Sequence, residues 1–149
     1  MTSPRPATTA KIPALSALHV GDALPERVHI CDNVQLFMYN AALWNAHRIH
    51  FDLPYATEVE GYPGLVIAGP LMGDWLGQCV DDWALDAATL VRIEYSNRQA
   101  AYVGDTLTAG GNIDAIDTQK RKVTIALFIK NAAGEVITPG TALLRFNEA

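Results

Sequence analysis

One stretch of the chain combines helical periodicity with very few charged residues, and it restricts the fold more than any other. It opens at Gly69-Pro70, where proline takes the favourable first position of a helix. The apolar residues that follow at helical spacing are Leu71, Met72, Trp75, Leu76, Cys79, Val80 and Trp83. A helix this apolar needs cover on most of its sides, so we expect it at the centre of the fold.

The last third of the chain alternates with the period of two that β-strands show. Residues 91–95 and 123–129 alternate in this way, and each predicts a strand. A further strand starts after Gly104-Asp105 and runs toward Asp117, with a bulge expected at Gly110-Gly111, and the final strand is interrupted at Pro139-Gly140. Together with the apolar helix, these strands predict an α+β fold in which an antiparallel sheet wraps around a central helix.

The first third of the chain predicts an arm and a second helix. Residues 1–13 are rich in Pro, Ser and Thr and lack periodicity, which indicates a flexible arm before a single domain over 14–149. Residues 27–30 fit a short strand. Asp32 is then a good N-cap, with glutamine three residues later, for a helix over 33–44.

Composition excludes several classes of protein. The chain carries a net charge of −5 without a basic cluster, so nucleic acid is a poor partner. No apolar run approaches the ~18 residues of a membrane span, and residues 1–12 lack an apolar core, so we do not expect them to be a secretory signal. Cys31 and Cys79 lie in apolar stretches, which favours buried thiols and a cytoplasmic location. With 50% apolar residues, some apolar surface is expected to face a partner.

Polar residues concentrate in the irregular segment from Asn45 to Gly64. His50 is the best general acid or base there at neutral pH, and its alternative role is to cap a turn. Asn45 can converge with His50 only if the preceding helix ends between them. His47 and Asp52 lie within three residues of His50, but this group lacks a further ligand at a suitable spacing, so we expect no metal site.

Gly69 stands where the apolar helix begins. Because Pro70 has no N–H, the donors available at this helix start are those of Gly69 and Leu71. Such donors, with the positive end of the helix dipole, suit a developing oxyanion such as the enolate of a thioester. The alternative is that Gly-Pro only starts a helix.

The order of these residues resembles the MaoC-like (hydratase 2) hot-dog dehydratases. Asn45 to Asp52 is similar to the family's Asn- and His-containing motif, Gly69 to its central-helix glycine, and 102–107 to its Gly-Asp-Thr-Leu strand entry. Residues 59–66 resemble a subgroup that includes hydroxyacyl-thioester dehydratases and mesaconyl-CoA hydratases. The departures are an asparagine at the acid position, Ala68 where a histidine is common, and one hot-dog unit where subgroup members often carry two.

The resemblance implies a hot-dog fold and reversible hydration of a 2-enoyl thioester, without a cofactor. It implies that His50 is the base, that Asn45 orients the water and that the Gly69 amide holds the thioester oxygen. The residues expected to bind substrate are His47, Arg48, Tyr55, Gly64, Leu71 and Arg98. Arg48 either binds a carboxylate of the acyl group or pairs with Asp52 or Glu60.

The partners implied are an acyl-CoA or acyl-carrier-protein thioester and a second hot-dog chain, in a homodimer, a higher homo-oligomer or a hetero-oligomer. The basic residues that could meet CoA phosphates are Arg92, Arg98, Lys120, Arg121 and Lys122. The alternative function is a non-catalytic hot-dog subunit that binds acyl thioesters and needs a second chain for activity. A hot-dog thioesterase is less favoured, because only Asp52 and Glu58 could supply the carboxylate that hydrolysis normally uses.

Overall fold

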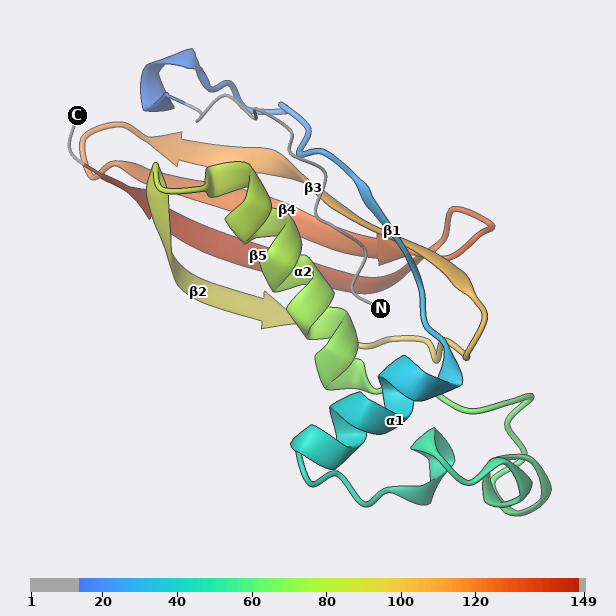
Figure 1. Ribbon diagram of the computed structural model, residues 1–149. Helices are drawn as coiled ribbons and strands as arrows, with labels where there is room; N and C mark the ends of the chain where they lie inside the picture. The colour runs from blue at the N-terminus through green and yellow to red at the C-terminus, as the bar shows by residue number, and fades with distance from the viewer. Residues whose placement is uncertain (1–13, 148–149) are drawn as a thin grey trace.

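A five-stranded antiparallel sheet with one long helix across its face forms the body of the protein (Figure 1). The computed structural model describes residues 14–147, so the expected arm over 1–13 lies outside it. The strand order is β1-β3-β4-β5-β2. The strands are β1 (Arg27–Ile30), β2 (Ala88–Tyr95), β3 (Thr106–Asp117), β4 (Lys122–Lys130) and β5 (Val136–Phe146). The helices and helical turns are 3-10 turn Leu15–Ala17, α1 (Asn33–Ala42), 3-10 turn Arg48–His50, π-helical turn Tyr55–Val59 and α2 (Gly69–Ala84). The predicted α+β class is confirmed.

The helix α2 supplies the centre of the core, as predicted. Trp75, Leu76 and Val80 are among its fully buried side chains, and they belong to one cluster with the inward-facing residues of β3, β4 and β5. One stripe of the helix, carrying Asp74 and Asp81, remains exposed, so burial is less complete than predicted. Within residues 14–147, no helix is long and apolar enough to cross a membrane.

The helix α1 begins as predicted and ends two residues earlier than predicted. The carboxylate of Asp32 accepts a hydrogen bond of 2.7 Å from the backbone N–H of Gln35. At the other end, Trp44 has a φ of 55°, and its N–H donates to Ala41 O at 3.2 Å. The N–H of Asn45 donates to Asn40 O at 2.8 Å, which completes a Schellman motif. This termination turns the chain at Asn45, the first residue of the predicted site.

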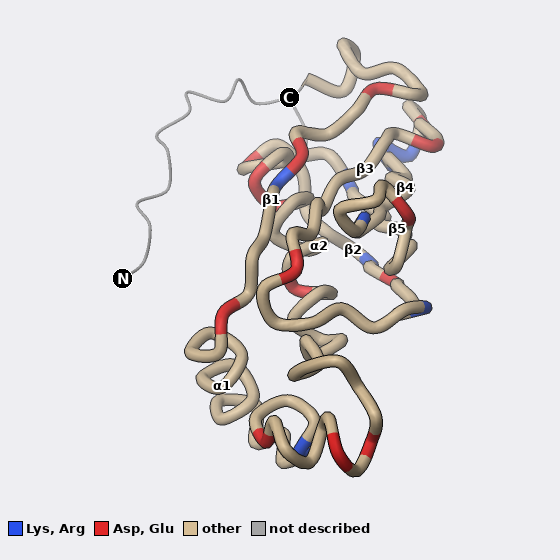
Figure 2. Tube along the Cα trace, turned by 90° about the vertical axis from the view of Figure 1, so that its right-hand side faces the viewer, with Lys and Arg blue, Asp and Glu red and all other residues tan. Residues whose placement is uncertain are grey.

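Exposed apolar side chains gather on β1 and α1. They are Val28, Ile30, Val34, Phe37 and Met38, followed by Leu43 and Trp44 after the helix. The helix α1 carries no charged residue along its length (Figure 2), and Trp44 is 92% exposed. Surfaces of this kind are typical of protein interfaces. Seven of the fifteen exposed large hydrophobic side chains among the described residues therefore lie on this part of the molecule.

The predicted bulge at Gly110-Gly111 is wrong. Both glycines pair regularly with β4, opposite Phe128 and Leu127, and the register shifts instead between Ile113 and Ala115. A Cβ at position 110 would lie 2.7 Å from the Phe128 ring, and one at 111 would lie 2.8 Å from a β4 carbonyl oxygen. These glycines therefore permit close packing in a regular strand.

The predicted interruption at Pro139-Gly140 is also wrong, because β5 runs through it without a break. The carbonyl of Pro139 accepts a hydrogen bond of 3.0 Å from the N–H of Ser96, which lies just beyond the end of β2. In an antiparallel strand, the N–H and C=O of one residue point to the same side. The N–H that Pro139 lacks would therefore point toward β2, which has already ended at this level, so no ladder hydrogen bond is lost.

The alternation predicted for 91–95 fails at Val91. The register between β2 and β5 shifts between Leu90 and Arg92, and the intervening Val91 is turned outward and exposed. A bulge inserts one unpaired residue and so reverses the facing pattern locally. The rest of β2 pairs with β5 as an edge strand of the sheet.

His29 on β1 stacks on Trp75 of α2, with the ring centroids 4.4 Å apart and an interplanar angle of 10°. Its Nε2 is buried and has no hydrogen-bond partner among the described residues. Burial, and secondarily the charge of Arg27, lowers the pKa of His29 to about 4. The native state therefore holds this ring neutral inside the fold.

We expect this histidine to weaken the fold in acid. The unfolded chain takes up the proton near pH 6.5 and the folded chain only near pH 4, so stability from His29 is present above 6.5 and is lost between 6.5 and 4. His29→Phe keeps a stacked ring that does not titrate. Between pH 7 and pH 4, the Tm of His29→Phe minus that of the native chain should rise by roughly 4 °C or more. Thermal unfolding followed by circular dichroism measures this, and a constant difference would contradict it.

Candidate active site

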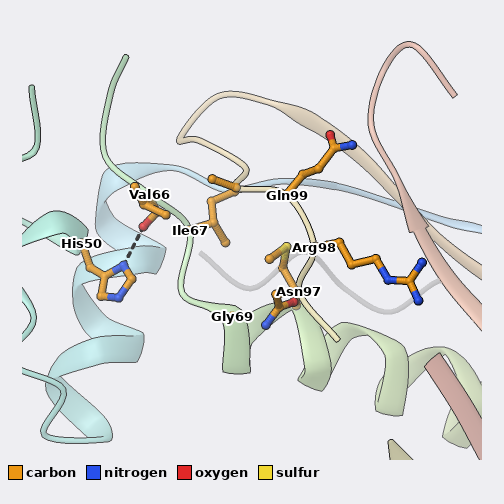
Figure 3. Close-up of a pocket in the computed structure, with 9 residues that line it drawn as sticks. His50, Val66, Ile67, Gly69, Asn97, Arg98 and Gln99 are labelled. Atoms are coloured by element: carbon orange, nitrogen blue, oxygen red, sulfur yellow. Dashed lines mark hydrogen bonds between the residues drawn. The ribbon is translucent and has the colours of Figure 1, made fainter. Parts of the chain in front are cut away.

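The 3-10 turn Arg48–His50 holds His50 against the strand-like segment that leads into α2. The N–H of Val66 donates to Ile49 O at 3.0 Å, and His50 Nδ1 lies 2.7 Å from Val66 O (Figure 3). The next residue, Ile67, donates its N–H to Ala101 O at 2.8 Å. The histidine is therefore tied to backbone that continues directly into the start of the helix.

This anchor selects the tautomer of His50. A carbonyl oxygen only accepts, so Nδ1 carries the proton and Nε2 presents a lone pair in the neutral ring. Burial lowers the pKa of His50 from its ordinary value of 6.5, the bond to Val66 opposes this, and His47 lowers it further. The His47 ring meets the His50 ring edge to face at 5.6 Å. At neutral pH the ring is an uncharged base.

A cavity of about 310 Å³ joins His50 to the start of α2. It is lined by His50, Val66, Ile67, Gly69, Met72, Asn97, Arg98, Gln99 and Ala100. Of the predicted site residues, the cavity thus brings together His50, Gly69 and Arg98. The remaining six, Asn45, His47, Arg48, Tyr55, Gly64 and Leu71, lie outside its lining.

The start of α2 presents one open backbone donor to this cavity. Ala68, the N-cap, makes no side-chain cap, and its carbonyl accepts from Leu71 N–H at 3.0 Å and from Met72 N–H at 3.4 Å. The expectation that Leu71 offers a donor is therefore wrong, because its N–H is used within the first turn and its side chain is buried in the core. No acceptor among residues 14–147 takes the N–H of Gly69.

Asn45 is held by an asparagine that the sequence analysis missed. The Nδ2 of Asn45 donates to Asn40 Oδ1 at 2.7 Å, and the Oδ1 of Asn45 accepts from His47 N–H at 3.2 Å. Asn40 is only 2% exposed, and its own Nδ2 donates to Leu36 O at 2.8 Å. The available signal was a polar residue four positions after buried Leu36, on the inward face of α1. Asn45 keeps one amide hydrogen and one lone pair for another partner.

Arg48 belongs to an exposed cluster outside the cavity. Its Nε and Nη2 donate to Asp52 Oδ2 at 3.0 and 2.6 Å, and its guanidinium lies 4.1 Å from the centre of the Tyr55 ring. Hydrogen bonds from Arg48 lower the pKa of Asp52. Tyr55 in turn donates its hydroxyl to Glu60 at 2.8 Å. Of the two ion pairs considered, the structure therefore forms the one with Asp52.

Of the other predicted substrate-binding residues, Gly64 lies outside the cavity and Arg98 lines it. Gly64 has open space around it, with no atom within 4 Å of a built Cβ, and it does not reach the cavity. Arg98 lines the cavity, and Figure 3 shows its guanidinium on the far side from His50. In the described part of the chain, no group of three or more His, Cys, Asp and Glu side chains is placed to hold a metal ion.

Asn97, which follows β2, is a cavity residue that periodicity did not indicate. Its Oδ1 accepts a hydrogen bond of 3.1 Å from the hydroxyl of Thr138 on β5. Its Nδ2 lies over Gly69, where a built Cβ would be only 2.2 Å away. The residue lies after the alternating segment, so only the packing of β2, β5 and α2 reveals it.

The sheet order and its helix define a hot-dog protein. The fold matches the unliganded R-hydratase PhaJ1 from Pseudomonas aeruginosa with a TM-score of 0.83 at 19% identity, covering 93% of this chain and 87% of that chain. It also matches a chain of the ChsH1-ChsH2 complex from Mycobacterium tuberculosis, with a TM-score of 0.77 at 21% identity, covering 87% and 98%. The predicted hot-dog fold is confirmed.

The sequence then narrows this class to a family. Residues 4–103 match hydroxyacyl-thioester dehydratase type 2, and the chain belongs to this family. Mesaconyl-C(4)-CoA hydratase of Chloroflexus aurantiacus is 53% identical over 53 residues, which are 36% of this chain and 19% of that protein. The chain therefore aligns with only about a fifth of the length of this curated relative.

Proposed function

We propose that this chain hydrates a 2-enoyl thioester to a 3-hydroxyacyl thioester, reversibly, and that the thioester is an acyl-CoA. The observation that carries the proposal is the pairing, in one cavity, of a neutral His50 with the unused N–H of Gly69. Addition of water to an enoyl thioester needs a base at Cβ and a donor at the carbonyl oxygen. Family membership and the likeness to mesaconyl-C(4)-CoA hydratase support the same reaction.

In this mechanism His50 moves both protons. Its Nε2 takes a proton from water as the water oxygen bonds to Cβ, and the electrons of the double bond shift through Cα onto the thioester oxygen. The Gly69 N–H and the positive end of α2 stabilise that enolate oxygen. The imidazolium then returns a proton to Cα as the carbonyl re-forms. One water is added, and His50 is restored to its neutral form.

Asn45 is proposed to hold the attacking water through its remaining amide hydrogen or lone pair. We expect Asn45→Ala to lower the rate of hydration by about 10²-fold, because the water loses its orientation. Asn40→Ala tests the same role indirectly, because it removes the hydrogen bond that holds the Asn45 side chain and so frees that side chain to rotate. Steady-state hydration of crotonyl-CoA measures both variants. Native activity in Asn45→Ala with an unchanged Tm would rule out this role.

Arg98 is proposed to meet a phosphate of CoA at the far end of the cavity. We expect Arg98→Gln to raise the KM for crotonyl-CoA by about 10-fold, since it removes one charge-assisted contact. The KM for crotonyl-pantetheine, which lacks the nucleotide phosphates, should stay unchanged. Arg92→Gln is the control, because this arginine pairs with Glu94 on β2 outside the cavity. Equal effects on both thioesters would remove Arg98 from phosphate binding.

Arg48 and Tyr55 are proposed to stabilise the loop. The ion pair to Asp52 and the stacked ring use the guanidinium outside the cavity, which supports this reading over capture of an acyl carboxylate. His47 is proposed to act through its contact with the His50 ring.

We propose further that the functional unit contains two hot-dog chains. Within the described residues, β2 leaves one side of its backbone unpaired at the edge of the sheet, and the apolar residues of β1 and α1 are exposed in the single chain. The structural likeness to a chain of the ChsH1-ChsH2 complex supports a paired arrangement.

A non-catalytic subunit is the second candidate, because an asparagine stands at the acid position of the motif and cannot take up a proton as a carboxylate does. Incubation of the purified chain with crotonyl-CoA or mesaconyl-CoA, followed by mass spectrometry for the gain of one water, separates the two. Hydration by the chain alone, sensitive to His50, supports the enzyme. If the chain binds butyryl-CoA but does not hydrate crotonyl-CoA or mesaconyl-CoA by itself, and becomes active only after co-expression with a second hot-dog chain, the subunit is supported.

A further inference from the structure

Thr138 is a buried polar residue to which the proposed mechanism gives no role. It is fully buried, at 0% exposure, on β5. Its hydroxyl donates to Asn97 Oδ1 at 3.1 Å and lies 3.9 Å from Met72 Sδ. A hydroxyl at this depth is costly unless it is hydrogen-bonded. The bond to Asn97 satisfies it and, in return, sets the orientation of the asparagine amide.

With Oδ1 directed at Thr138, the NH₂ group of Asn97 points the other way, over the first turn of α2. The three atoms nearest to a Cβ built on Gly69 are all in the Asn97 amide, and Nδ2 is the closest at 2.2 Å. Figure 3 shows Asn97 at the start of the helix, beside Gly69 and across the cavity from His50. No acceptor among residues 14–147 takes a hydrogen bond from Nδ2.

We infer that the side-chain amide of Asn97 is a second donor to the thioester oxygen, acting together with the Gly69 N–H. This inference rests on the proposed function for the identity of the ligand. Both donors lie at the same end of the cavity, neither has an acceptor among residues 14–147, and a carbonyl oxygen has two lone pairs to receive them. As the oxygen gains charge, two oriented donors stabilise it more than one. Thr138 is then a positioning residue.

The inference also explains the glycine at position 69. A side chain there would occupy the space that the Asn97 amide now fills. The absence of a Cβ allows a side-chain donor from the end of β2 to come alongside a backbone donor from α2.

A saturated thioester tests the contact without any turnover. Butyryl-CoA labelled with ¹³C at the carbonyl is bound to the purified chain, and the isotope-edited infrared band of its carbonyl is compared between variants. We expect the native chain to shift this band to lower frequency, and Asn97→Ala to lose about half of the shift, because one of two donors is gone. Gln99→Ala is the matched control, since Gln99 is another amide of the cavity wall whose side chain points away from Gly69.

Kinetics supply the second readout. In Asn97→Ala we expect kcat for crotonyl-CoA hydration to fall about 10²-fold, with KM changed less than about threefold, as removal of an oxyanion donor does. Thr138→Val should give a smaller loss of kcat, and Thr138→Ser, which keeps the hydroxyl, should recover it. Thermal unfolding of each variant separates these effects from loss of the fold.

The outcomes distinguish this inference from the proposed reaction. If the native chain hydrates crotonyl-CoA but Asn97→Ala keeps its infrared shift and its kcat, the donor role is overturned. If the native chain hydrates neither crotonyl-CoA nor mesaconyl-CoA while the infrared shift of bound butyryl-CoA still depends on Asn97, the proposed reaction fails and the donor stands. If Thr138→Ser behaves like Thr138→Val, the positioning role of the hydroxyl is overturned.

Discussion

His50→Gln should lower the hydration of crotonyl-CoA by at least about 10²-fold while leaving the fold intact. Glutamine can still donate an amide hydrogen to Val66 O, which now accepts from His50 Nδ1 at 2.7 Å. It cannot take a proton from water near neutral pH. The variant therefore separates the two uses of this residue, as an anchor for the loop and as a base. His50→Ala removes both, so we expect a lower Tm in that variant as well.

The pH dependence gives the same assignment an independent check. Because burial lowers the pKa of His50, kcat/KM should rise with pH along an acid limb whose midpoint lies below pH 6.5, the ordinary value for a histidine. His47 adds to this lowering, so His47→Gln should move the midpoint of the acid limb to higher pH. An active His50→Gln would refute the role of His50 as the base, and an acid limb that His47→Gln leaves in place would refute the electrostatic effect of His47 on it.

Gly69→Ala should reduce kcat by about 10²-fold or more, because the new methyl group and the Asn97 amide compete for one position. The Cβ would lie 2.2 Å from Asn97 Nδ2, so the amide has to leave the start of α2. The Gly69 N–H itself remains. The expected loss is therefore that of the side-chain donor, together with any displacement of the thioester oxygen.

A double-mutant cycle shows whether these two losses are one event. In an Asn97→Ala background the clash is absent, so Gly69→Ala should cost little more, and the two changes should be strongly non-additive. Gly77→Ala is the control on the same helix, since nothing lies within 4 Å of its built Cβ. That variant should keep native kcat and gain about 1 kcal/mol of stability from helix propensity. Additive losses at positions 69 and 97 would show that the two residues act separately.

Local patterns predicted the elements of this fold well and their irregularities poorly. The capping of α1 by Asp32 and the alternation of β4 depend on neighbours close in the chain, so both could be recognised in advance. The regular pairing of Gly110 and the continuity of β5 through Pro139 depend on what the adjacent strand presents at the same level. Glycine and proline preferences describe an isolated chain, and pairing with a neighbouring strand can place either residue inside a regular strand.

The candidate site shows the same contrast between what local sequence predicts and what packing decides. From the sequence alone, residue chemistry singled out His50 as a candidate base and Gly69 as the opening of an apolar helix. Only the tertiary structure decided that Val66, 16 residues away, selects the tautomer of His50, and that Leu71 has no N–H to offer. It also placed the Asn97 amide beside Gly69, where a hydrogen bond from Thr138, 41 residues after Asn97 in the chain, orients it. The physical reason is that periodicity records which face of an element is buried, whereas a donor or a lone pair becomes available only when the packed neighbours leave it without a partner.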